Sequence, residues 1–93
     1  MHIQISNMKK TKAVLYVAPW CGGCVKMKPE FYKECKANGV DFEIVDVETP
    51  EGVKRSIKNS VRNVPTIIFV RNGREVGREK GNSSYLKIAE YAK

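Results

Sequence analysis

Trp20-Cys21-Gly22-Gly23-Cys24 is the stretch that decides how this chain folds. Its two cysteines lie three positions apart, so their side chains can form a disulfide across one turn of a helix. An apolar run, Ala13–Val17, precedes the stretch and is typical of a strand buried on both faces, and a segment with helical spacing follows it. The cysteines are therefore expected at a strand-to-helix junction, where the unpaired N–H groups and the helix dipole favour the thiolate form of Cys21.

The helix that follows is predicted over residues 22–37. Its apolar spacing places Cys24 on the buried side and leaves Cys21 exposed at the tip, and the buried stripe consists of Cys24, Met27, Phe31 and Cys35. We interpret Cys35 as a core side chain and not as a third reactive thiol. A zinc site is not predicted, because only Cys35 and His2 remain as further ligands and Cys35 lies about 16 Å along the helix from Cys24.

The second half of the chain continues the alternation of strands and helices. Asp41–Val47 is predicted as a parallel strand, and Thr49 as the N-cap of a helix with Pro50 at its first position. This helix is expected to bury Val53, Ile57 and Val61. Two antiparallel strands, Thr66–Val70 and Arg74–Lys80, are predicted around Asn72-Gly73, the strongest hairpin signal in the chain.

Ser83 or Ser84 is expected to cap a last helix, whose apolar stripe is Tyr85, Ile88, Ala89 and Ala92. The elements together predict an α/β fold with a central mixed sheet and three flanking helices. The sheet has four strands, or five if Met1–Ser6 is also a strand.

Length and composition predict one domain over residues 1–93, since 93 residues of which 42% are hydrophobic suffice for one core. We expect a cytoplasmic monomer with no membrane partner, because the chain has no long apolar run and its N-terminus lacks the order of a secretory signal. The formal net charge of +7 favours acidic proteins or nucleic acid as partners. Because the basic residues are spread along the whole length, we regard nucleic acid as the less favoured of the two.

Several separated signals make the chain resemble the thioredoxin superfamily from about Ala13 to Lys93, as a small thioredoxin-like or glutaredoxin-like redoxin. The signals are Trp20-Cys21-Gly22-Gly23-Cys24, Pro29 in the following helix, Val64-Pro65-Thr66, Asn72-Gly73 and Gly81. The resemblance implies a thioredoxin-like fold and a thiol–disulfide oxidoreductase that reduces protein disulfides. It also implies a redox-active Cys21–Cys24 disulfide, no bound cofactor or metal, and an outside reductase such as thioredoxin reductase.

The same resemblance implies a role for individual residues. Cys21 would be the nucleophile and Cys24 the resolving thiol, with Gly22 and Gly23 between them in the active-site loop. Pro65 would be the family's cis-proline, beside which the backbone of Val64 can bind an extended substrate. Substrate-binding residues around Cys21 would be Trp20, Val64, Pro65 and Gly81.

Two departures from the family pattern limit what the resemblance implies. Gly23 replaces the proline that thioredoxins usually have between the cysteines, so the reduced loop is less rigid and the reduction potential does not carry over. Leu15 stands where the family usually has a buried aspartate that assists proton removal from the second cysteine.

Four alternatives to a general disulfide reductase are therefore open. One is a glutaredoxin-like or dedicated redoxin that donates electrons to one client, for example ribonucleotide reductase. Another is a non-enzymatic thioredoxin-fold binding module that uses the positive charge. An oxidase and a disulfide isomerase are the remaining two, because Gly23 and the missing aspartate could raise the potential.

Overall fold

Strands and helices alternate along residues 10–92, the part of the chain that the computed structural model describes. The expected strand Met1–Ser6 and His2 lie outside this part. The elements in chain order are β1 (Thr11–Val17), α2 (Gly22–Ala37), β2 (Asp41–Asp46), α3 (Pro50–Lys58), β3 (Thr66–Arg71), β4 (Arg74–Lys80), the 3₁₀ turn η1 (Ser84–Lys87) and α4 (Ile88–Tyr91). Their bounds agree with the predicted ones to within two residues up to the end of β4, except that α3 ends at Lys58, three residues before Val61, which was expected on its buried face.

The sheet is mixed and has the strand order β2-β1-β3-β4. β1 pairs in parallel with β2 and antiparallel with β3, which in turn forms an antiparallel hairpin with β4. At the tip of this hairpin Asn72 and Gly73 have φ angles of 56° and 76°, the left-handed values that a two-residue hairpin turn requires. The predicted α/β fold with a four-stranded mixed sheet and three helices is confirmed.

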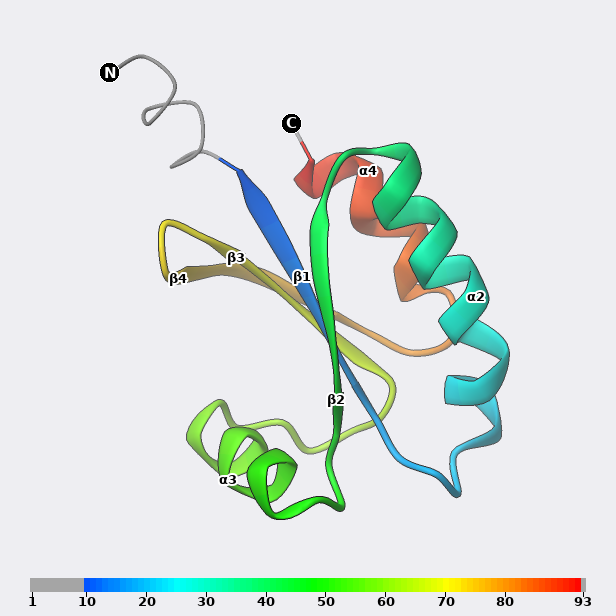
Figure 1. Ribbon diagram of the computed structural model, residues 1–93, viewed down its shortest axis with the longest axis vertical. Helices are drawn as coiled ribbons and strands as arrows, with labels where there is room; N and C mark the ends of the chain where they lie inside the picture. The colour runs from blue at the N-terminus through cyan, green and yellow to red at the C-terminus, as the bar shows by residue number, and fades with distance from the viewer. Residues whose placement is uncertain (1–9, 93) are drawn as a thin grey trace.

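Alternate side chains of the central strand β1 fill two cores on opposite faces of the sheet. Ala13, Leu15 and Val17 point into a core that α2 and α4 cover, whereas Val14 and Tyr16 point into a smaller core on the face of α3. Figure 1 shows α2 and α4 on one side of the sheet and α3 on the other. Residues 13–18 are accordingly all buried, so the end of β1 that leads to the cysteines is packed on both faces.

The predicted buried face of α3 is wrong. Thr49 does cap the helix, with its Oγ1 accepting a hydrogen bond from the N–H of Gly52 at 3.0 Å, but Val53 and Ile57 are 43% and 75% exposed. Gly52 is the residue that α3 buries, since a Cβ at this position would lie 1.7 Å from the carbonyl oxygen of Asp46. The helix therefore approaches the end of β2 with its glycine side and turns its apolar side outward.

The last helix also differs from the prediction. It begins as the 3₁₀ turn η1, and neither Ser83 nor Ser84 caps it through a side-chain hydrogen bond to its first turn. Ser84 is buried instead, and its hydroxyl donates to the carbonyl oxygen of Gly81 at 2.7 Å. Ile88 is buried as expected, but Ala89 is exposed. No helix within residues 10–92 is long and apolar enough to cross a membrane.

Candidate active site

Cys21 occupies the N-cap position of α2. Its backbone is extended, and its Sγ accepts a hydrogen bond from the backbone N–H of Cys24 at 3.1 Å. The first turn of α2 contains no acidic residue, so nothing in that turn opposes the positive end of the helix dipole. In the reduced protein the same N–H and dipole favour a thiolate on Cys21.

Cys24 forms a disulfide with Cys21, with a Cα–Cα distance of 5.2 Å. The two sulfurs differ in accessibility, because Cys24 is 1% exposed and Cys21 is only partly buried. Leu15 lies in the same core as Cys24 and is fully buried, so an apolar side chain occupies the position of the family's aspartate. A partner can therefore reach Cys21 first, and no carboxylate at position 15 takes up the proton of Cys24.

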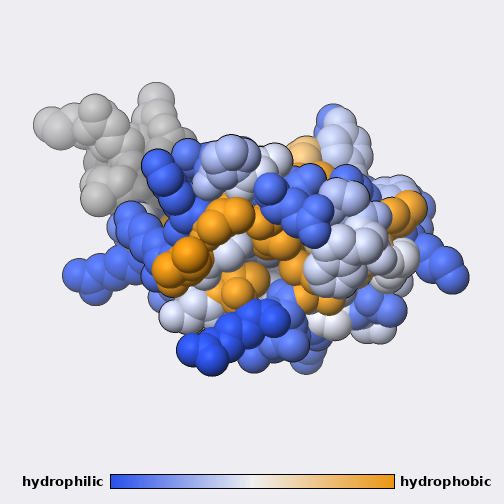
Figure 2. All heavy atoms as spheres, turned by 90° about the horizontal axis from the view of Figure 1, so that it is seen from below, coloured by the Kyte–Doolittle hydropathy of each residue, from blue (hydrophilic) through white to orange (hydrophobic). Residues whose placement is uncertain are grey.

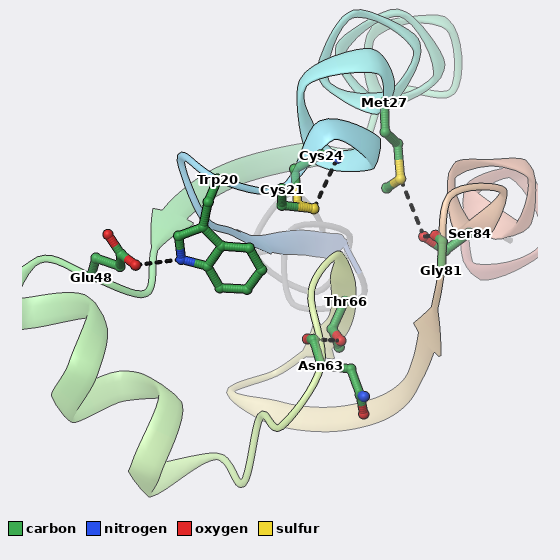
Figure 3. Close-up of a disulfide and its surroundings, with 9 residues drawn as sticks. All are labelled: Trp20, Cys21, Cys24, Met27, Glu48, Asn63, Thr66, Gly81 and Ser84. Carbon is green, nitrogen blue, oxygen red and sulfur yellow. Dashed lines mark hydrogen bonds between the residues drawn. A yellow bond between two sulfur atoms is a disulfide. The ribbon is translucent and has the colours of Figure 1, made fainter.

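Trp20 lies on the surface next to this disulfide. Its side chain is 69% exposed, and its indole N–H donates a hydrogen bond to the carboxylate of Glu48 (Figure 3). Glu48 follows the end of β2, and its backbone N–H donates a hydrogen bond to Oδ1 of Asp46 at 2.8 Å. The indole is thus tied to the β2–α3 connection. The sequence carried no signal for the role of Glu48, because it belongs to a short polar connection 28 residues away from Trp20.

The loop before β3 approaches the disulfide from another side. The peptide bond between Val64 and Pro65 is cis, as the resemblance implied, and Pro65 is buried. Its carbonyl oxygen accepts a hydrogen bond from the N–H of Gly81 at 3.0 Å, which links this loop to the end of β4. Gly81 has a φ of +97°, a value that favours glycine. Three connections, after β1, before β3 and after β4, therefore meet at the site.

An apolar groove of about 230 Å³ lies between Trp20 and α3. It is lined by Trp20, Val47, Val53, Ser56, Ile57, Val61, Arg62, Asn63 and Val64. Figure 2 shows hydrophobic side chains gathered on the face of the molecule that bears α3, with hydrophilic residues around them. The groove brings together the predicted substrate-binding residues Trp20 and Val64. The other two predicted substrate-binding residues, Pro65 and Gly81, do not line it. Val53 and Ile57, which we expected in the core, do.

Cys35 is separated from this site. It is fully buried in the core under α2, and burial, with a smaller contribution from the charge of Glu34, raises the pKa of its thiol to about 12. Its interpretation as a core side chain is confirmed. Within residues 10–92 no three His, Cys, Asp or Glu side chains are grouped so that they could hold a metal ion.

The mixed sheet, the cysteine pair at the N-terminus of α2 and the cis-proline in the loop before β3 define a redox domain with a thioredoxin-like fold. The chain belongs to the thioredoxin family, whose model matches residues 2–93. Its redox-active group is the Cys21–Cys24 disulfide.

Solved structures of thioredoxins are similar to the chain over nearly its whole length. Thioredoxin of Fasciola hepatica superposes with a TM-score of 0.79 and 28% identity, over 99% of this chain and 90% of that one. The oxidised thioredoxin of Plasmodium falciparum superposes with a TM-score of 0.79 and 26% identity, over 97% of this chain and 88% of that one.

Curated relatives include much longer proteins. Protein disulfide-isomerase of Gallus gallus is 38% identical over 63 residues, which are 64% of this chain and 12% of that protein. A thioredoxin domain-containing protein of Theileria parva is 28% identical over 79 residues, which are 85% of this chain and 36% of that protein. The chain thus spans only 12% of the length of the first of these relatives and 36% of the length of the second.

Proposed function

We propose that this protein reduces disulfide bonds of other proteins through the Cys21–Cys24 pair. The observation that carries the proposal is the unequal placement of the two sulfurs, with Cys21 accessible as the N-cap of α2 and Cys24 buried behind it. In this arrangement the thiol of Cys21 can react with a disulfide of another protein, whereas the thiol of Cys24 can react only with Cys21. Residues 1–93 would act as one domain in this reaction.

The reaction would proceed in two thiol–disulfide exchanges. The Cys21 thiolate attacks one sulfur of the substrate disulfide, a mixed disulfide forms, and the other substrate sulfur leaves as a thiolate. The Cys24 sulfur, after losing its proton, then attacks Cys21, so that the second substrate sulfur leaves and the Cys21–Cys24 disulfide forms. Two electrons pass from the protein to the substrate. An outside reductant must return these two electrons to the Cys21–Cys24 disulfide. We propose an enzyme such as thioredoxin reductase for this step.

The groove beside Trp20 would receive the substrate. An extended segment that follows the backbone at Val64 would bring its cysteine to Cys21 and place a neighbouring apolar side chain against Val53 and Ile57. The outward position of Ile57 supports this role, because an isoleucine that is 75% exposed contributes little to the core of a free protein. A reductant of this kind works in a reducing compartment, and the cytoplasm is the compartment that we propose.

Substitution of single cysteines tests the mechanism. The wild-type protein is expected to accelerate the reduction of a protein disulfide by dithiothreitol, which turbidity follows. Cys21→Ser is expected to abolish this acceleration. Cys24→Ser is expected to accumulate the mixed disulfide, which mass spectrometry detects. Cys35→Ala is the matched control, because it removes a thiol that lies outside the pair, and it should retain the activity. Full activity of Cys21→Ser would show that the mechanism is wrong.

The direction of the reaction depends on the reduction potential. Equilibration with graded thiol–disulfide buffers, trapping by alkylation and mass spectrometry would give its value. A potential near about −270 mV supports a reductant, whereas one above about −200 mV supports a glutaredoxin-like or oxidising role. The potential has to be measured because the chain is also similar to protein disulfide-isomerases. Turnover with thioredoxin reductase and with glutathione, measured side by side, identifies the class of reductant.

A further inference from the structure

The side chain of Asn82 lies directly against Gly23, which stands between the two cysteines. A Cβ built at Gly23 would be 2.1 Å from Oδ1, 2.7 Å from Cγ and 2.9 Å from Nδ2 of Asn82. The whole carboxamide of Asn82 therefore occupies the space that any side chain at position 23 would need. Gly22 differs in this respect, since a Cβ at that position would meet no atom within 4 Å.

The segment that carries Asn82 is fixed on both sides of it. The N–H of Gly81 donates to the carbonyl oxygen of Pro65 at 3.0 Å. The hydroxyl of Ser84 is buried and lies 2.7 Å from the carbonyl oxygen of Gly81 and 3.5 Å from Sδ of Met27, which belongs to α2 (Figure 3). Asn82 is thus presented to the first turn of α2 by a backbone that is tied both to the loop before β3 and to α2.

We propose that Asn82 is a positioning residue that restrains the Cys21–Cys24 segment at the start of α2 by packing on Gly23, and that it thereby stabilises the disulfide over the dithiol. The inference rests on the redox function proposed above. A helix whose first two residues are glycines can adopt many conformations at this end once the disulfide is reduced, and most of them separate the two sulfurs. A contact that limits these conformations raises the effective concentration of one thiol at the other, and so favours ring closure.

The contact also replaces a restraint that the sequence lacks. Where thioredoxins usually have a proline between the cysteines, this chain has the most flexible residue, and a carboxamide from a distant segment lies over it. Position 23 and position 82 are therefore coupled, since a larger residue at 23 and the observed placement of Asn82 exclude each other. Because Asn82 is exposed, its side chain can rotate away from a Cβ at position 23 without disturbing the core.

A double-mutant cycle with the glutathione equilibrium as its readout tests the proposal. In this equilibrium two electrons and two protons leave the cysteine pair, and one glutathione disulfide becomes two glutathione molecules. Asn82→Ala is expected to lower the equilibrium constant for disulfide formation about three- to tenfold. In the Gly23→Ala background the same substitution should change it less than about twofold, because the methyl group has already displaced Asn82.

Gly22→Ala provides the matched background, in which Asn82→Ala should keep its full effect, because nothing lies within reach of that methyl group. An equal effect of Asn82→Ala in all three backgrounds, or no effect in any, would overturn the proposal. Urea unfolding of the oxidised and reduced forms gives a second measurement. Equal loss of stability in both forms would also overturn it, since it would assign Asn82 to the fold alone. If the wild-type protein shows no two-electron transition, the proposed function fails together with this inference.

Discussion

Replacement of Gly52 by alanine is expected to destabilise the protein, although alanine is normally the better helix former. The added methyl group would lie 1.7 Å from the carbonyl oxygen of Asp46, 2.7 Å from its carbon and 2.9 Å from Oγ1 of Thr49. Two of these atoms belong to the backbone, so the clash cannot be relieved by turning a side chain. Either α3 or the end of β2 must move by more than about 1 Å, a distance far beyond ordinary packing adjustments.

The magnitude follows from three contributions. Overpacking of this kind costs roughly 1–3 kcal/mol, and movement of α3 weakens the hydrogen bond from the Gly52 N–H to Thr49, a cap worth about 1 kcal/mol. The higher helix propensity of alanine returns at most about 1 kcal/mol. We therefore expect the free energy of unfolding to fall by about 2 kcal/mol, which corresponds to a decrease of about 10 °C in the midpoint of thermal unfolding for a domain of this size.

Urea unfolding followed by far-ultraviolet circular dichroism measures this difference, with Gly22→Ala as the control. Gly22 is also in the first turn of a helix, but its Cβ would meet nothing within 4 Å, so this variant should be unchanged or more stable by up to about 1 kcal/mol. A Gly52→Ala variant that is as stable as wild type, or more stable, would refute the packing of α3 on β2 described here.

Two further predictions concern titratable groups. The hydrogen bonds from Arg55 and Lys12 lower the pKa of Glu43 to about 2. Glu43→Gln should therefore lose about 0.5–1 kcal/mol of stability at pH 7. The loss is modest because the side chain of Glu43 is about a third exposed. Since the folded pKa is depressed, the gap between wild type and variant should shrink as the pH falls from about 4.5 towards 2, and urea midpoints that keep a constant gap over this range would contradict it. Burial, reinforced by Glu34, raises the pKa of Cys35 to about 12, so iodoacetamide at pH 8 should label Cys35 at least about a hundredfold more slowly in the folded, reduced protein than in urea. Peptide mass spectrometry measures both rates, and similar rates would show that Cys35 is accessible.

The order and bounds of most elements were predictable because their signals are local. The continuous apolar run at Ala13–Val17 indicates a strand with two buried faces, and Asn72-Gly73 indicates the hairpin from two residues alone. The cysteine pair was equally plain, since its spacing and its place before a helix need no tertiary information. The roles predicted for the residues around it, such as Trp20 and Gly81, stay predictions.

What the sequence did not indicate depends on contacts between distant segments. A helical pattern at Val53 and Ile57 implies an apolar face but not what covers it, and here the close approach at Gly52 turns that face towards the groove. Likewise, Asn82 reads as an ordinary turn residue after a strand, and its position on Gly23 is set by the hydrogen bonds of Gly81 and Ser84.

The position of Trp20 provides the protein with a built-in optical probe. It is the only tryptophan in the chain, it adjoins a disulfide that can quench its excited state, and it is hydrogen-bonded to Glu48. Its emission intensity should therefore rise on reduction, and its emission wavelength should respond when a ligand enters the groove. Redox state and occupancy of the groove can thus be followed in the unlabelled protein, in real time, through the two properties of a single indole.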